Sequence, residues 1–233
     1  MGDRRGVLAP AAAAACPRGA ALIVAALIVA SWLGVGSPNT RPITQSPQDL
    51  ADSAEADFTQ GHLVEAVAKY DRLATMVPEV APMLWQRGIA LYELGRYAEC
   101  AQQFASYFAV NRADLENATW HFLCAARSTT PAAALAGVLP AGPDPRILRS
   151  EVFAMIRGRM SPDALMALAD TSVPIVRFYA HFYIGYYLEA TGNATAARPH
   201  FAAAASPELS EEAGFLAIVA RIHLSRLGNV KTP

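Results

Sequence analysis

Residues 81–114 outline the fold most clearly, and they read APMLWQRGIALYELGRYAECAQQFASYFAVNRAD. Apolar side chains such as Ile89 line a first helix, Gly88 leaves room for a neighbouring helix to approach closely, and Gly95 lies in a turn. A second helix follows, with residues three positions apart that share one face. These residues are Ala98, Ala101, Phe104 and Tyr107. The segment therefore predicts a helical hairpin with a small-residue notch.

The same pattern recurs in two further segments of equal length. A copy upstream at 47–80 has Gly61 in the place of Gly95, and a third copy at 178–211 has Gly192 there. One hairpin cannot bury its own apolar stripe, whereas stacked copies share a continuous core. The sequence therefore predicts an all-α solenoid of about three helical hairpins.

The period and the glycine positions resemble the tetratricopeptide repeat (TPR). Three segments also occur in the order and spacing of the C-terminal half of the bacterial NlpI-type TPR lipoproteins: RGIALYELGRYAECAQQF (87–104), MIRGRMSPDALMALA (155–169) and HFYIGYYLEATGNATAARPHFAAAA (181–205). The resemblance implies an envelope-located adaptor that dimerises and presents a protein substrate or partner to a protease or cell-wall hydrolase. This chain has no lipid-acceptor Cys at the end of its apolar N-terminal run, so lipid anchoring is not carried over.

The remainder of the predicted TPR-like domain, 47–226, also has a helical pattern. Residues 115–177 predict an irregular helical insert, because their apolar pattern is out of phase with the repeats. A capping helix is expected at 210–226, over the last repeat, followed by a tail at 227–233. Three polar residues followed by proline resemble N-caps and mark expected helix starts within the insert. They are Thr130-Pro131, Asp144-Pro145 and Ser161-Pro162.

The N-terminus carries an uncharged run, Gly19–Gly36. As a helix it would reach about 27 Å, against a hydrocarbon core of roughly 30 Å. Residues 1–36 are therefore expected to be an apolar helix that acts either as a signal anchor or as a cleaved signal sequence. The positive-inside rule then places the repeats on the translocated, periplasmic or lumenal side. The chain would be a single-pass membrane protein or, after cleavage, an exported or organellar soluble one. Residues 37–46 predict an exposed linker.

The sequence contains no recognisable motif for catalysis or metal binding. His121 and Cys124 lie close in sequence but match no zinc-ligand spacing. His181 and His200 fall on the two helices of one repeat, where packing or a hydrogen bond is favoured over ligation. We therefore expect no enzymatic activity, no metal and no cofactor. The sequence leaves open whether Cys100 and Cys124 pair.

The first helix of each hairpin in a TPR array lines a concave face that binds a peptide or a helix. The positions expected on that face are Phe58, Trp85, Ile89, Tyr92, Tyr179, Phe182 and Tyr186. Aromatic residues at the centre of an interface contribute roughly 2 kcal/mol or more each to binding. The alternative to a binding surface is that half of these residues are simply buried under the insert. We expect an adaptor that binds other proteins or peptides. The second hypothesis is a self-associating structural or assembly protein, such as a homodimer, without a peptide groove. A net charge of -1 with only two lysines excludes a charge-steered binder of nucleic acid.

Overall fold

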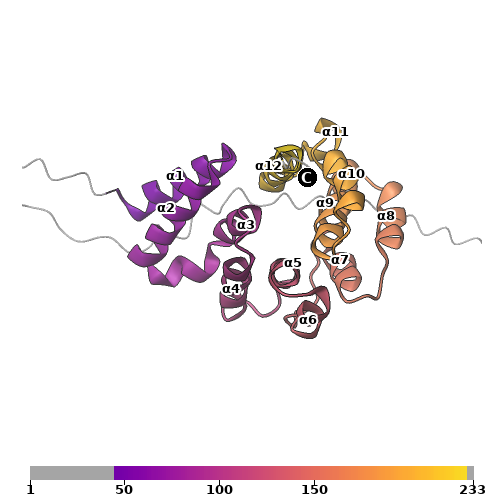
Figure 1. The fold of residues 1–233 in the computed structure, drawn as a ribbon, viewed down its shortest axis with the longest axis horizontal. Helices are drawn as coiled ribbons and strands as arrows, with labels where there is room; N and C mark the ends of the chain where they lie inside the picture. Colours follow the sequence, from indigo (N-terminus) through magenta and orange to yellow (C-terminus); the bar gives the residue numbers. More distant parts are fainter. Residues whose placement is uncertain (1–44, 230–233) are drawn as a thin grey trace, which may run out of the picture. The chain divides into compact units, whose positions relative to one another are not determined.

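The computed structural model describes residues 45–229, and the regular structure in that range is entirely helical (Figure 1). The predicted signal or anchor segment 1–36 and nearly all of the linker 37–46 lie outside the described residues. The elements are α1 (Pro47–Thr59), α2 (Leu63–Met76), the 3-10 helix η2 (Pro78–Met83), α3 (Trp85–Glu93), α4 (Tyr97–Phe108), α5 (Leu115–Ser128), α6 (Pro131–Ala136), α7 (Arg149–Ile156), α8 (Pro162–Asp170), α9 (Pro174–Ala190), α10 (Ala194–Ala204), α11 (Pro207–Ser210) and α12 (Phe215–Asn229).

Three adjacent helix pairs correspond to the three predicted hairpins: α1 with α2, α3 with α4, and α9 with α10. Each pair turns at a glycine with a positive φ, which is 80° at Gly61, 75° at Gly95 and 91° at Gly192. An L side chain is strained in this left-handed region, so glycine is the residue that ends the first helix without cost. The predicted all-α architecture of stacked pairs is confirmed.

The predicted notch is also present, in two of the pairs. A Cβ atom added to Gly88 would lie 2.6 Å from the ring of Phe104, and one added to Gly185 would lie 3.0 Å from the ring of Phe201. Both rings are buried. The missing side chain on the first helix therefore lets the aromatic ring of the second helix pack directly on its backbone.

The insert between the pairs begins two of its helices at the predicted caps. The Thr130 hydroxyl accepts a hydrogen bond from the backbone N–H of Ala133 at the start of α6, and the Ser161 hydroxyl accepts one from Ala164 at the start of α8. Proline at the first helical position adds a backbone angle that already suits the helix. Both predicted starts are confirmed.

The predicted helix start at Pro145 is wrong, because α7 begins only at Arg149. The Asp144 carboxylate accepts hydrogen bonds from the Arg146 side chain and backbone N–H instead of capping a helix, at 2.9 and 3.0 Å. The chain then passes through Leu148 in a left-handed conformation, with φ at 57°. Contacts of Arg146 hold this loop away from a helical path.

The predicted capping helix begins later than expected. Residues 207–210 form the separate short helix α11, and Gly214 has a φ of 55°, so α12 begins at Phe215 instead of 210. It continues to Asn229, past the predicted end at 226. The last helix is therefore a distinct element joined to α11 by a short link, in which Ala213 is buried.

A disulfide joins Cys100 on α4 to Cys124 on α5, with the two Cα atoms 5.6 Å apart. This separation is the usual one for a disulfide, and both residues are fully buried. Such bonds persist in oxidising compartments, so the bridge indicates an extracytoplasmic location. Within residues 45–229, no helix is both long and apolar enough to cross a membrane.

Candidate functional site

The C-terminal helix α12 lies against the first helices of the repeats. The ring of Phe215, at its start, has its centroid 4.7 Å from that of Phe58 on α1 and 5.0 Å from that of Trp85 on α3. Two turns further along, the His223 ring lies 4.8 Å from the ring of Tyr186 on α9. Figure 1 shows α12 between α1 to α3 on one side and α9 to α11 on the other. The chain's own last helix therefore occupies the face where the sequence predicts a groove.

We call the surface that receives α12 the α12 seat. Its residues are Phe58, Trp85, Tyr92, Glu93, Tyr186, Glu189 and Phe201, each of which has a ring contact, hydrogen bond or ion pair with Phe215 or His223. The seat brings together side chains from α1, α3, α9 and α10. It therefore depends on the stacking of the repeats.

Burial divides the seven predicted binding residues into two groups. The five that are buried are Phe58, Ile89, Tyr92, Phe182 and Tyr186. Trp85 stays 38 % exposed, and Tyr179 is partly buried, with the Arg149 guanidinium 4.5 Å from its ring centre. The expected open row of aromatic side chains is therefore replaced by a covered one, because α12 lies over one part and Trp120 of α5 packs on Phe182 and Tyr186. A role of these residues in binding a partner stays a prediction.

A buried polar cluster lies at the centre of the α12 seat. His223 Nδ1 lies 3.0 Å from each carboxylate oxygen of Glu93, and Nε2 lies 3.6 Å from Glu189 Oε2. The Tyr186 hydroxyl donates to Glu93 at 2.7 Å, and the Tyr92 hydroxyl donates to Glu189 at 2.9 Å. Two carboxylates from different repeats thus face one imidazole of α12.

The carboxylates of Glu93 and Glu189 raise the pKa of His223 on α12. Burial alone would lower the pKa of His223, but the charge of Glu93 and the hydrogen bond to it, with the charge of Glu189, raise that pKa above 6.5. Burial and the neighbouring carboxylates raise the pKa values of Tyr92 and Tyr186 well above 10, so both hydroxyls keep their protons. A protonated His223 between two carboxylates attracts α12 to its seat.

The burial of the cluster limits the chemistry that it can perform. Glu93 is 5 % exposed, Glu189 8 % and His223 5 %. A general acid or base must reach the proton that it transfers, and these groups are buried between α12 and the repeat helices α3 and α9. The arrangement holds a helix in place. Sequence reasoning missed His223, because it could not show which side of the last helix would face the repeats.

The two histidines of the third pair touch each other. His181 Nδ1 and His200 Nδ1 lie 3.0 Å apart, so one ring donates a hydrogen bond to the other. Burial lowers both pKa values, which favours the neutral rings that such a bond requires. The described residues contain no group of three or more His, Cys, Asp or Glu side chains placed to hold a metal. The predicted contact between these two histidines, by packing or a hydrogen bond, is confirmed.

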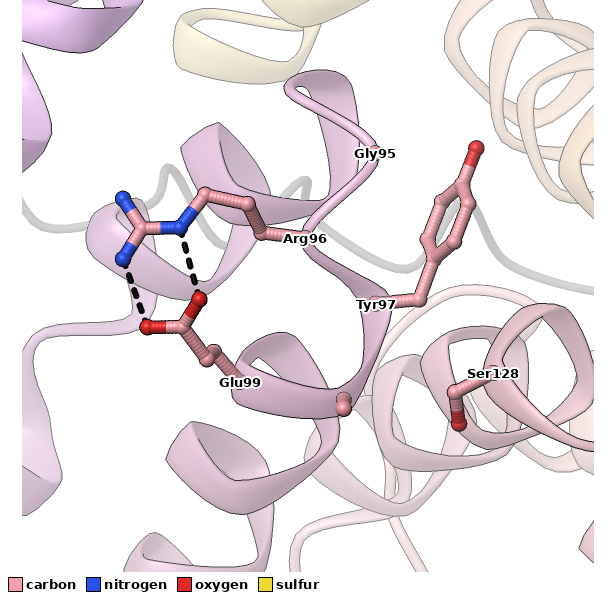
Figure 2. Close-up of a pocket in the computed structure, with 6 residues that line it drawn as sticks. Gly95, Arg96, Tyr97, Glu99 and Ser128 are labelled. Atoms are coloured by element: carbon pink, nitrogen blue, oxygen red, sulfur yellow. Dashed lines mark hydrogen bonds and ion pairs between the residues drawn. The ribbon is translucent and has the colours of Figure 1, made fainter.

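Figure 2 shows a shallow hollow at the turn between α3 and α4. Arg96 Nε donates a hydrogen bond to Glu99 at 2.7 Å, which lowers the pKa of Glu99 and raises that of Arg96. The Ser128 hydroxyl donates to the carbonyl of Ala125 at 3.1 Å instead of to a base. The Tyr97 hydroxyl accepts a hydrogen bond from Arg127 Nη2 at 2.7 Å. The polar side chains of the hollow are therefore already paired, and they do not form a nucleophile with its base.

Comparison with known proteins adds no family to these observations. No family model matches the chain, and no curated protein matches its sequence. The fold defines the class: an all-helical domain of stacked helix pairs, with its own last helix packed against them.

Proposed function

We propose that this chain is a non-enzymatic TPR adaptor, membrane-tethered or exported, that binds protein partners through its concave helical face. The resemblance to NlpI-type lipoproteins adds that such an adaptor presents its partner to a protease or hydrolase. The observation that carries the proposal is the position of α12. Its Phe215 inserts between Phe58 and Trp85, so the inner face already accommodates a helix through aromatic anchors.

Trp85 gives a partner its point of contact at the edge of the α12 seat. It is one of the few large apolar side chains that stay exposed in the described part of the chain, and its indole packs edge-on against Phe215. Tryptophan is enriched among the residues that dominate binding energy. A partner that covers Trp85 would extend the aromatic contact that α12 begins.

Affinity capture with the full chain tests the proposal. Trp85→Ala removes the exposed anchor, and Val64→Ala is the matched control, because Val64 is an exposed apolar residue on α2. We expect the wild type and Val64→Ala to capture equal amounts of the same partner, and Trp85→Ala to capture at least about tenfold less. Equal recovery by all three would contradict the groove assignment. Tyr92 is unsuited to this test, because its burial makes a truncation destabilise the fold.

A second candidate function is self-association as a structural or assembly protein. The observation that favours it is the burial of five of the seven predicted binding residues within the chain itself. Light scattering of the purified chain tests this candidate. A monomer would remove self-association, whereas a dimer without added partner fits both candidates, because the resemblance also implies an adaptor that dimerises. In that case the capture experiment with Trp85→Ala decides between them.

A further inference from the structure

The α12 helix is held by fewer large buried side chains than the repeat helix that faces it. On α9 the buried residues include Phe178, Phe182, Tyr183 and Tyr186. On α12, up to Gly228, the buried residues are Ala217, Val219, Ala220 and His223. Its larger apolar residues stay partly exposed, and these are Phe215, Leu216, Ile218, Ile222, Leu224 and Leu227. Because hydrophobic stabilisation follows the apolar area buried, α12 gains less from its seat than α9 gains from the core.

The electrostatic fit between α12 and its seat is incomplete. His223 Nε2 is buried and makes no hydrogen bond, since Glu189 Oε2 lies 3.6 Å away. Burying charged groups costs desolvation free energy that is recovered only when each donor and acceptor finds a partner. The imidazole therefore satisfies Glu93 but leaves its second N–H without an acceptor.

A guanidinium group suits this position better than an imidazole. It carries five N–H donors in a planar fork, whereas a protonated imidazole carries two. Two carboxylates, Glu93 and Glu189, and the rings of Tyr92 and Tyr186 surround the position, and both carboxylates and aromatic faces favour a cation. The guanidinium groups of Arg226 on α12 and Arg127 on α5 approach these two carboxylates only to 3.8 Å, which is beyond hydrogen-bond distance, so neither supplies the missing donor. A helix that brings an arginine there can satisfy both carboxylates at once.

We infer that the α12 seat is a binding site for an amphipathic helix of a partner protein, and that this helix displaces α12. The partner helix carries an aromatic residue that enters between Phe58 and Trp85, and an arginine two turns later that faces Glu93 and Glu189. The inference rests on the proposed adaptor function and specifies its ligand. A second copy of this chain is a poorer occupant, because its α12 makes the same contacts while the tethered α12 acts at a millimolar effective concentration.

Labelled peptides test this inference with the full chain, by fluorescence polarisation. One peptide has the natural sequence 213–229, a second has His223→Arg, and a third has both Phe215→Ala and His223→Ala. The chains are the wild type, Phe215→Ala, which loosens the tethered helix, and Arg221→Ala as the control, because Arg221 is exposed on α12. Circular dichroism establishes that each chain is folded.

We expect the His223→Arg peptide to bind every chain about tenfold more tightly than the natural peptide, as one additional charge-assisted hydrogen bond provides. Both should bind Phe215→Ala more tightly than the wild type, and Arg221→Ala should match the wild type. The inference is overturned if neither peptide binds a folded Phe215→Ala chain, or if the peptide with two alanines binds equally well. Unfolding of Phe215→Ala would also overturn it, because α12 would then be an inseparable part of the core.

The outcomes separate this inference from the adaptor function on which it rests. If partner capture depends on Trp85 but no peptide binds, the adaptor function is supported and the displacement of α12 is wrong. Dimerisation of the wild-type chain that the natural peptide abolishes would assign the seat to a second copy and overturn the partner helix. Peptide binding with the expected preference for arginine supports the inference directly.

Discussion

Reduction of the disulfide between Cys100 and Cys124 is expected to lower the free energy of unfolding by about 3.5 kcal/mol. The two residues are 24 positions apart, so the bond closes a loop of that size in the unfolded chain. In the chain-entropy model, closing a loop of this length lowers the conformational entropy of the unfolded chain by about 12 cal/mol/K, which at 298 K corresponds to about 3.5 kcal/mol. Because a domain of this kind has a net stability of only about 5–15 kcal/mol, the loss is large enough to measure.

Urea unfolding followed by circular dichroism, with and without reductant, measures this loss. The control is the double variant Cys100→Ala, Cys124→Ala, because both side chains are fully buried and alanine keeps the position small and apolar. We expect the reductant to destabilise the wild type and to leave the double variant unchanged. A change below about 1 kcal/mol in the wild type would refute the reasoning, since it would show that the bond constrains little in the unfolded chain. Mass spectrometry of the protein isolated from cells reports whether the bond forms there.

The remaining predictions concern the repeat notch and the polar cluster, and urea unfolding measures them all. Gly88→Ala should destabilise by about 1 kcal/mol, because overpacking against Phe104 at about 1–3 kcal/mol exceeds the roughly 1 kcal/mol gained in helix propensity; a more stable variant would contradict the notch. The pKa of His223 is raised in the folded state, so its contribution is full below pH 6.5 and is lost as pH rises through the folded value. A His223→Gln variant should lack this fall in the free energy of unfolding with rising pH. An equal fall in both chains would count against a stabilising role of protonated His223. Tyr186→Phe should cost about 1.5–3 kcal/mol, since its hydroxyl donates to the buried Glu93 carboxylate, and a loss under about 0.5 kcal/mol would argue against that bond.

The sequence was sufficient for the features that depend on local chemistry. Gly61, Gly95 and Gly192 were expected in turns, and each has the left-handed backbone that only glycine adopts easily. The caps at Thr130 and Ser161 followed from a polar residue before a proline. In all these cases the physical cause lies within a few residues of the feature, so a pattern along the chain is enough to find it.

Features that depend on distant contacts were not predictable in the same way. The delayed start of α7 follows from Arg146, whose guanidinium reaches Asp114 at 2.7 Å and Glu116 at 3.1 Å at the beginning of α5. A local pattern at Asp144 and Pro145 contains no trace of those partners. The buried polar cluster is a stronger case, since Glu93 and His223 are 130 positions apart. Only the path of the folded chain brings them together.

The position of α12 explains why one aromatic stripe supports two interpretations of function. The last pair of a solenoid leaves an apolar face exposed, and a capping helix must cover it. Here α12 packs against α10 for that purpose, and the same helix turns Phe215 and His223 toward α1, α3 and α9. A cap needs only apolar contact with the last repeat. Capping therefore does not explain why a buried histidine lies between carboxylates of two different repeats. Such a contact costs desolvation free energy and gives specificity in return, which suits a helix that competes for its seat better than one that is permanently fixed.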